Sequence, residues 1–133
     1  MSPSFISHEL YLIYNPDSDI GRKTHALALS LNRVLHEINI MDKTITRLHW
    51  KEIISMLGIP ASKLLNNRHP DYSKFIKNND YSEQDFLEIV FQNPQLVKGP
   101  IGILQNKAVL CDDPADILHL DYTPGAEKKS YTF

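Results

Sequence analysis

Residues 10–24, LYLIYNPDSDIGRKT, decide how the rest of the chain is read. The stretch opens with a continuous apolar and aromatic run, Leu10–Tyr14, which is bounded by the pair Asn15-Pro16. A short apolar run closed by a turn signal is typical of a strand buried on both faces. Polar residues follow, and Ser18 or Asp19 can cap a helix that starts there. The stretch therefore predicts a strand, a loop and a helix in succession.

The helix is expected to run well beyond residue 30, because apolar side chains recur at helical spacing and would bury one face. These side chains are Leu27, Leu31, Val34, Leu35 and Ile38. The short β-branched segment Ile38–Asp42 then predicts a second strand. Because a strand-helix-strand crossover within one sheet joins parallel strands, we expect this strand to lie parallel to the first.

Length and composition restrict the class of protein. The chain has 133 residues, of which 42% are hydrophobic and 23% charged, and these values predict a single domain over residues 1–133. The formal net charge of −2 gives no basic field that could gather phosphates, so direct nucleic-acid binding is not expected. We expect no signal peptide and no membrane association, since no apolar run approaches the roughly 20 residues of a membrane span. Residues 123–133 are expected to form a flexible tail.

Cysteine usage favours a cytoplasmic protein. Cys111 is the single cysteine, which excludes an internal disulfide, a CxxC redox pair and a multi-cysteine zinc site. Because Cys111 ends a predicted strand, we interpret it as a buried, inert thiol rather than a reactive one. The six histidines show no HxH, HxxxH or HExxH pairing, so the sequence predicts no metal site.

The middle third, about residues 44–95, is predicted to be an all-helical insert. Thr46 can cap a helix that Gly58 would stop in the left-handed conformation. The apolar stripe of that helix includes Trp50, and we interpret it as core rather than as a recognition surface. Ser82 begins another helix with a capping-box-like S-E-Q-D sequence.

The last third predicts a hairpin and a final helix. Two brief apolar runs, Ile101–Leu104 and Ala108–Leu110, are separated by Gln105–Lys107, which is hairpin spacing. The pair Asp113-Pro114, with aspartate as cap and proline at the first helical position, predicts a helix that runs through Leu120.

This order of elements resembles thioredoxin topology with an insertion, and four segments resemble those of the ArsC-type arsenate reductases and their Spx-type regulator relatives. The segments are YNPDSDIGRKT (14–24), which is similar to the family's NPxCxxSRxT loop, LGIPASKLLNN (57–67), QNPQLVKGPIGIL (92–104) and KAVLC (107–111). The resemblance covers residues 10–120. It implies a thioredoxin-like α/β fold with a four-stranded mixed sheet, formed by a parallel strand-helix-strand unit and a C-terminal hairpin.

The resemblance also indicates which chemistry is missing. Reductases of this family attack arsenic with a low-pKa cysteine at a helix N-terminus, and a thiol donor such as glutathione resolves the adduct. Ser18 occupies the position of that cysteine, and a hydroxyl cannot undergo reversible thiol redox chemistry. Tyr14 stands where the reductases often carry a histidine. Ser18 and Gly21 also replace both cysteines of the Spx-type CxxC switch.

The three oxyanion-binding arginines of the family have no counterpart when they are carried over one by one. Asn66 falls at the first position and Gly99 at the second, before a proline. Asp112 falls at the third, with Asp113 as the alternative if the length differs by one residue. An aspartate in place of a cation reverses the local charge. Arg68, two residues past Asn66, could partly compensate for the first loss.

Two interpretations of the loop after the first strand stay open. One is an anion or thiol-ligand pocket, whose candidate residues are Asn15, Ser18, Arg22, Lys23 and Thr24. The other is an ordinary capped helix, which is favoured because Asp17 and Asp19 repel anions. The resemblance further implies that Pro100 is a structural cis-proline beside this loop.

The sequence thus predicts an ArsC- or Spx-like protein without intact catalytic residues, acting as a binding or regulatory module with no cofactor and a protein partner. One alternative is a residual thiol oxidoreductase that uses Cys111 with glutathione or another thiol donor. A second alternative is an Spx-type partner of RNA polymerase. The sequence does not identify the ligand, the partner or the oligomeric state.

Overall fold

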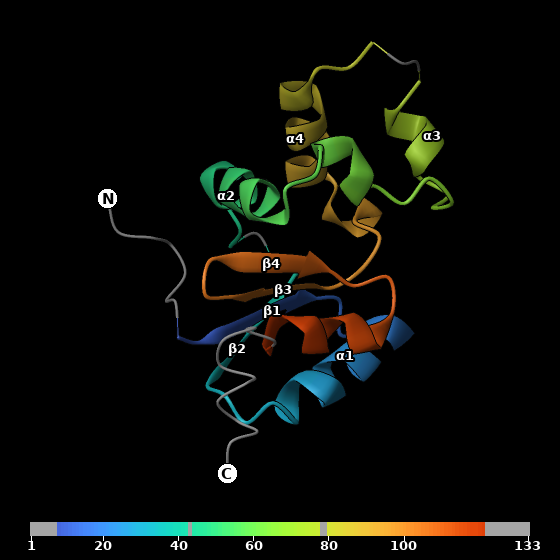
Figure 1. The fold of residues 1–133 in the computed structure, drawn as a ribbon. Helices are drawn as coiled ribbons and strands as arrows, with labels where there is room; N and C mark the ends of the chain where they lie inside the picture. The colour runs from blue at the N-terminus through green and yellow to red at the C-terminus, as the bar shows by residue number, and fades with distance from the viewer. Residues whose placement is uncertain (1–7, 43, 78–79, 122–133) are drawn as a thin grey trace.

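The computed structural model describes residues 8–42, 44–77 and 80–121 (Figure 1). The predicted tail, residues 123–133, lies outside these ranges. The elements in chain order are β1 (Leu10–Tyr14), α1 (Asp19–Leu29), β2 (Leu35–Asn39), α2 (Arg47–Leu57), η1 (Ala61–Leu64), α3 (Tyr72–Phe75), α4 (Glu83–Gln92), η2 (Pro94–Leu96), β3 (Ile101–Leu104), β4 (Lys107–Leu110) and η3 (Pro114–Asp121), where η marks a 3₁₀ helix.

The strands form one mixed sheet in the order β2-β1-β3-β4. Strands β1 and β2 pair in parallel, with Leu10 opposite Leu35. Strand β3 runs antiparallel to both β1 and β4. The predicted sheet, a parallel strand-helix-strand unit plus a C-terminal hairpin, is therefore confirmed. None of the helices in the described part of the chain has the length and apolar character that a membrane crossing requires.

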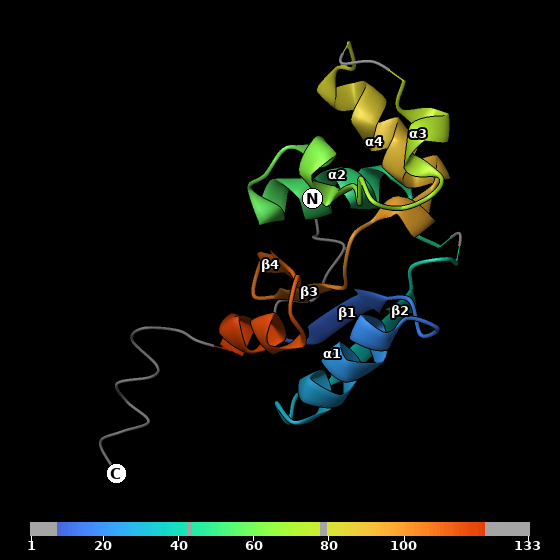
Figure 2. The same cartoon turned by 90° about the vertical axis from the view of Figure 1, so that its right-hand side faces the viewer.

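Helices cover both faces of the sheet, which explains why every residue of β1 is buried. Figures 1 and 2 show α1 and η3 on one face and the helical segment from α2 to α4 on the other. Side chains alternate along a strand, so Leu10, Leu12 and Tyr14 pack with α1 and η3. Tyr11 and Ile13 pack on the opposite face, where they join the α2 side chains.

The structure of the helical insert confirms the predicted helix starts, the predicted helix stop and the core position of Trp50. Trp50 of α2 is only 1% exposed and belongs to the core, as predicted. Thr46 Oγ1 accepts a hydrogen bond from the His49 N–H, and Gly58 ends the helix at φ 69°. Ser82 starts α4 with a reciprocal capping box to Asp85. These signals depend on neighbours close in sequence.

The predicted end of the first helix is wrong, because α1 stops at Leu29 and β2 begins at Leu35, three residues before the predicted strand. Asn32 adopts the left-handed conformation, φ 59°, and asparagine is one of the few residues that tolerate it. Val34 lies in the turn and is 60% exposed. After Leu29 the apolar residues therefore separate, because Leu31 and Leu35 pack on the α1 side of the sheet whereas Ile38 packs on the opposite side.

The hairpin and final helix differ slightly from expectation. Gln105 and Asn106, at φ 54° and 62°, form a two-residue turn in which both residues are left-handed, so Lys107 belongs to β4 rather than to the loop. The last helix is a 3₁₀ helix, and Asp113 Oδ1 caps it by accepting from the Ala115 N–H at 2.9 Å.

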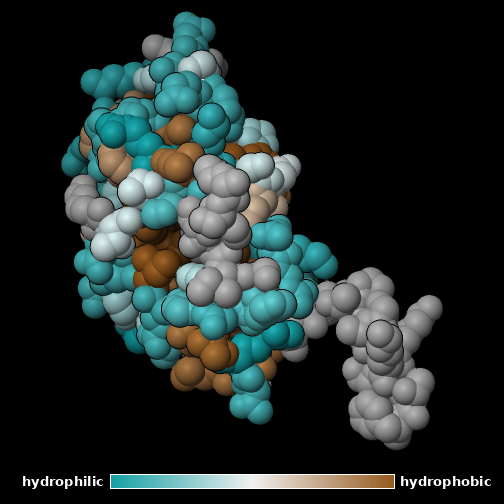
Figure 3. Space-filling view, turned by 90° about the vertical axis from the view of Figure 1, so that its left-hand side faces the viewer, coloured by the Kyte–Doolittle hydropathy of each residue, from teal (hydrophilic) through white to brown (hydrophobic). Residues whose placement is uncertain are grey.

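The molecular surface is mainly hydrophilic on the face that Figure 3 shows, with a few separate apolar areas. The large apolar side chains that are exposed come from different elements and do not define one continuous stripe in the sequence. They are Leu29, Val34, Met41, Leu48, Phe75 and Leu118.

Candidate functional site

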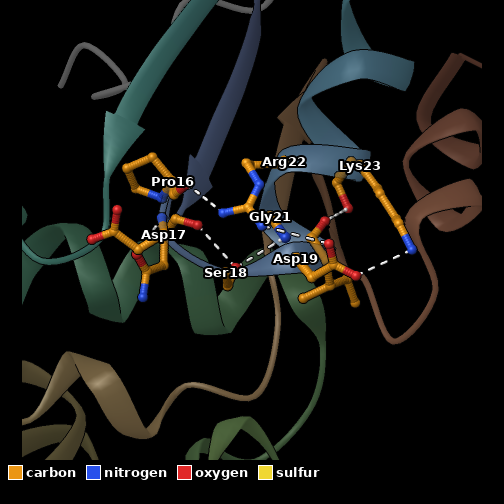
Figure 4. A network of polar contacts seen from close by, with 10 residues as sticks. Pro16, Asp17, Ser18, Asp19, Gly21, Arg22 and Lys23 are labelled. Carbon is orange, nitrogen blue, oxygen red and sulfur yellow. Dashed lines mark hydrogen bonds and ion pairs between the residues drawn. The ribbon is translucent and has the colours of Figure 1, made fainter.

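Ser18 is the N-cap of α1, and its hydroxyl is engaged in both hydrogen-bonding directions (Figure 4). Its Oγ accepts from the Gly21 N–H at 3.0 Å and donates to the Asn15 carbonyl oxygen at 2.9 Å. Asn15 Oδ1 in turn accepts from the Asp17 N–H at 2.9 Å. A Cβ on Gly21 would collide with both the Asn15 carbonyl oxygen and the Ser18 hydroxyl. The loop is therefore closed around the hydroxyl by its own backbone.

The three residues that follow in the predicted pocket are engaged with the helix itself. Arg22 and Lys23 both form ion pairs with Asp19, at 3.5 and 3.1 Å, as Figure 4 shows. Arg22 Nη1 also donates to the Pro16 carbonyl oxygen at 3.3 Å. Thr24 is buried, and its hydroxyl donates to the Ile20 carbonyl oxygen at 2.7 Å. Both cations of this loop thus share the single carboxylate of Asp19 in the first turn of the helix.

A cavity of about 300 Å³, the Ser18 cavity, lies beside this loop. Of the residues that the sequence singled out, Asn15, Ser18, Asn66 and Gly99 line this cavity, whereas Arg22, Lys23 and Thr24 do not. Its complete lining is Tyr14, Asn15, Ser18, Ile20, Ile40, Asn66, His69, Pro94, Gln95, Val97, Lys98, Gly99 and Pro100.

A second, more open cavity of about 560 Å³, the Lys98 cavity, shares two residues with the first, Asn66 and Lys98. It contains Arg68 and Asp112, which the sequence placed near the lost arginine positions. Its complete lining is Ser62, Lys63, Leu65, Asn66, Asn67, Arg68, Tyr72, Lys98 and Asp112. All four positions singled out by the resemblance, Ser18, Asn66, Gly99 and Asp112, therefore fall in this pair of adjoining cavities.

Two chain segments that are far apart in sequence hold Asn66 and Lys98 at the shared boundary. Leu65 and Val97 form an isolated antiparallel bridge. The Asn66 N–H donates to the Leu96 carbonyl oxygen at 2.7 Å, and the Lys98 N–H donates to the Leu64 carbonyl oxygen at 2.8 Å. Sequence reasoning missed Lys98, although it directly precedes the Gly99-Pro100 pair.

His69 is a second cavity residue that the sequence did not identify. Its Nδ1 accepts from the Asp71 N–H at 3.0 Å, which assigns the proton of the neutral ring to Nε2. The sequence pattern does not single out His69, because its neighbours in the cavity come from distant segments. No group of three or more His, Cys, Asp or Glu side chains within the described ranges is placed to hold a metal ion.

The predicted cis-proline is wrong: no cis peptide bond occurs in the described residues, so Gly99 and Pro100 are joined in trans. The trans form is the more stable isomer even before proline. Here the extended chain is held by the Cys111 N–H, which donates to the Pro100 carbonyl oxygen at 2.8 Å. A Cβ on Gly99 would collide with the carbonyl oxygen of Cys111, so glycine permits this close approach of two backbones.

Cys111 is fully buried, at 0% exposure, among side chains of the sheet face covered by α1 and η3. The pKa of its thiol is raised to about 12, first by burial and then by the neighbouring Asp116, Asp112 and Asp113 carboxylates. A thiol with such a pKa is protonated at neutral pH and is a poor nucleophile. The interpretation of Cys111 as a buried thiol is confirmed.

Tyr14 lines the Ser18 cavity but directs its hydroxyl to Glu37, donating to Oε1 at 2.9 Å. Its ring stacks on His25 at 5.3 Å between centroids, and His25 Nε2 lies 3.1 Å from the same Glu37 oxygen. Burial, followed by the Glu37 hydrogen bond, raises the pKa of Tyr14. The hydrogen bond from Tyr14 is the main cause that lowers the pKa of Glu37. Tyr14 is therefore a member of a structural cluster at this edge.

The fold is a thioredoxin-like α/β fold with a four-stranded mixed sheet. The profile of the ArsC family matches residues 13–120, and the chain belongs to this family. No curated protein matches the chain.

Solved structures share the fold at low sequence identity. An arsenate reductase from Vibrio cholerae superposes with a TM-score of 0.79 at 16% identity, covering 86% of this chain and 99% of that one. A protein from Yersinia pestis gives 0.77 at 21% identity, covering 84% and 99%. An arsenate reductase (ArsC) related protein from Brucella melitensis gives 0.58 at 12% identity, covering 99% and 100%.

Proposed function

We propose that this protein is a member of the ArsC family that does not reduce arsenate and that acts as a binding or regulatory module through the Ser18 and Lys98 cavities. The observation that carries the proposal is the position of Ser18. Its hydroxyl caps α1 beside the Ser18 cavity, in the place that the family resemblance assigns to the reactive cysteine.

The loop between β1 and α1 contains no thiol that could begin such a reaction. Arsenate reduction by a thiol mechanism requires a thiolate that attacks arsenic and is later released by a second thiol. The Ser18 hydroxyl has no corresponding redox states, and its single proton is donated to the Asn15 carbonyl oxygen. What remains is a hydroxyl that orders the loop.

Cys111 does not replace the missing thiol. It is buried, its thiol pKa is raised to about 12, and it is absent from the lining of both cavities. An oxidoreductase that uses Cys111 would have to expose a core residue surrounded by three aspartates. We therefore rank the binding role above residual oxidoreductase activity. A single buried cysteine is compatible with the reducing cytoplasm, where we place the protein.

A reductase assay with two thiol donors tests the proposal. Purified protein is incubated with arsenate and either glutathione or reduced thioredoxin, and arsenite formation is measured against a buffer blank. We expect no arsenite above the blank for wild type, Ser18→Ala or Cys111→Ser. Arsenite formation by the wild type that is lost in either variant would overturn the proposal and would identify the residue that carries the activity.

A further inference from the structure

Strand β4 is an outer strand of the sheet. In the described part of the chain, no strand lies beyond it in the order β2-β1-β3-β4, as Figure 2 shows. The Cys111 N–H donates to the Pro100 carbonyl oxygen, toward the β3 side. Because backbone groups alternate along an antiparallel strand, Ala108 and Leu110 direct their N–H and carbonyl groups away from β3. Within the described ranges, these two residues make no hydrogen bond on that outer side.

The side chains of β4 do not protect this edge against pairing with another strand. Proteins usually protect an outer strand with charged or proline residues along its length. In β4 the last three residues are apolar, and the single charge, Lys107, stands at the start of the strand. Val109 packs with the core on the α1 side of the sheet, whereas Ala108 and Leu110 pack with the core on the α2 side. A strand added at this edge would therefore extend both cores.

The opposite edge of the sheet, β2, is protected. The Val34 carbonyl oxygen and the Ile40 N–H both bond to β1, so the alternation of backbone groups turns those of Glu37 outward. Two copies of β2 paired about their centres would place two Glu37 carboxylates opposite each other, which is unfavourable. Of the two outer strands, β4 is therefore the one suited to pairing.

The two ends of β4 carry opposite charge. Lys107 is exposed at its start, and Asp112, Asp113 and Asp116 follow its end. Within the described ranges, none of these residues forms an ion pair. In an antiparallel pair of strands, the start of one strand lies beside the end of the other. The complementary occupant of this edge is thus a strand with a cation at its start and carboxylates after its end, and β4 itself has both.

We infer that β4 pairs with β4 of a second copy of this chain, antiparallel about a two-fold axis at Val109. Ala108 of each copy then lies opposite Leu110 of the other, and these residues exchange their outward N–H and carbonyl groups. Lys107 of each copy reaches Asp112 of the other. One sheet runs through both copies, and the interface is isologous. The inference does not depend on the proposed function, because no residue of β4 lines either cavity.

The pairing is short, so we expect a weak dimer with a dissociation constant on the order of 100 µM. Translational diffusion measured by NMR from about 20 µM to about 1 mM tests whether it forms. Amide hydrogen exchange identifies the interface, because the Ala108 and Leu110 N–H groups should exchange more slowly as the protein concentration rises. The Val109 N–H, which faces β3, should change little. A monomer at the highest concentration, or a dimer that leaves Ala108 and Leu110 unprotected, would overturn the inference.

Ala108→Pro tests the backbone pairing directly. Proline is tolerated on an outer strand where the replaced N–H faces solvent, so the hydrogen bonds between β3 and β4 should remain. We expect the variant to keep a cooperative thermal unfolding transition and to stay monomeric at concentrations at which the wild type dimerises. A folded Ala108→Pro variant with wild-type dimerisation would contradict the pairing.

Charge variants test the register, and they decide the question even if Ala108→Pro does not fold, since they change only exposed side chains. Lys107→Glu should weaken dimerisation about tenfold, because it replaces attraction by repulsion at both ends of the interface. Adding Asp112→Lys to this variant should restore the wild-type affinity to within about threefold. Lys51→Glu, at an exposed lysine of α2, is the matched control and should leave dimerisation unchanged. Equal effects of the two lysine variants, or no recovery in the charge swap, would refute the register.

Discussion

The Ser18 hydroxyl accepts a hydrogen bond from the Gly21 N–H at 3.0 Å and thereby caps the start of α1. The family resemblance implies a catalytic thiol at this position. The same hydroxyl donates to the Asn15 carbonyl oxygen. In a reductase the helix N-terminus would stabilise a thiolate. Here the neutral Ser18 hydroxyl accepts the hydrogen bond of a free N–H at this terminus. The neutral Ser18 hydroxyl thus joins the loop after β1 to the first turn of α1.

Ser18→Ala should lower the free energy of unfolding by about 1 kcal/mol, the usual effect of removing an N-cap side chain. The loss arises because the Gly21 N–H is left without its partner. Urea denaturation measures the difference. Ser18→Asn, which keeps a capping oxygen, should lose less than about half of that amount. Equal stability of the wild type and Ser18→Ala would show that the cap contributes nothing.

Ser18→Cys should introduce a thiol that reacts with iodoacetamide at least about tenfold faster than Cys111, because it lies at a helix N-terminus beside a cavity. Cys111 is buried, and its raised pKa keeps it protonated. Mass spectrometry of the labelled protein measures both rates. The wild type, which carries Cys111 alone, is the control. Comparable labelling of the two cysteines would contradict the assigned burial of Cys111.

Gly99→Ala should destabilise the fold by about 1–3 kcal/mol, the range for overpacked sites, since its Cβ would collide with the Cys111 carbonyl oxygen. Thermal unfolding measures the change. For the same reason Gly99→Arg, which supplies the cation of the family pattern, should destabilise the fold at least as much and should not create reductase activity. Gly58→Asn is the control, because nothing lies near its Cβ and asparagine tolerates a positive φ. A fully stable Gly99→Ala would contradict the close backbone approach.

Glu37 should make the free energy of unfolding depend on pH in the acid range. The hydrogen bond from Tyr14 is the first cause that holds its pKa below the ordinary 4.5, so its contribution is present above that value and is lost as the pH falls through the lowered pKa. Glu37→Gln should therefore flatten the fall of unfolding free energy below about pH 4.5. Urea titrations at several pH values measure the slope.

Asp42→Asn is the matched control for Glu37→Gln, because Asp42 is exposed and its side chain makes no hydrogen bond within the described ranges. Its acid slope should equal that of the wild type. If Glu37→Gln keeps the wild-type slope, the cluster of Tyr14, His25 and Glu37 does not couple folding to protonation.

The sequence correctly predicted helix ends that are set by residues close by in the chain. Thr46, Gly58 and Ser82 act through backbone groups within a few residues, and each was placed correctly at a helix end. The end of α1 failed because the periodicity of its apolar residues continued into β2, where the same side chains pack from a strand. Asn32 carried the correct signal, since asparagine tolerates the left-handed turn that separates the two elements.

The sequence by itself determined the family and the sheet topology, because these follow from residue order and residue type. Only the tertiary structure decided the rest of the site. Arg22 and Lys23 are neighbours of Ser18 in sequence, yet both pair with Asp19 and neither lines the Ser18 cavity. Lys98 and Asn66 are distant in sequence, yet the bridge between Leu65 and Val97 brings them to one boundary. The charge of a cavity depends on which side chains line it. Because these side chains come from segments that are distant in sequence, residue order alone does not specify that charge.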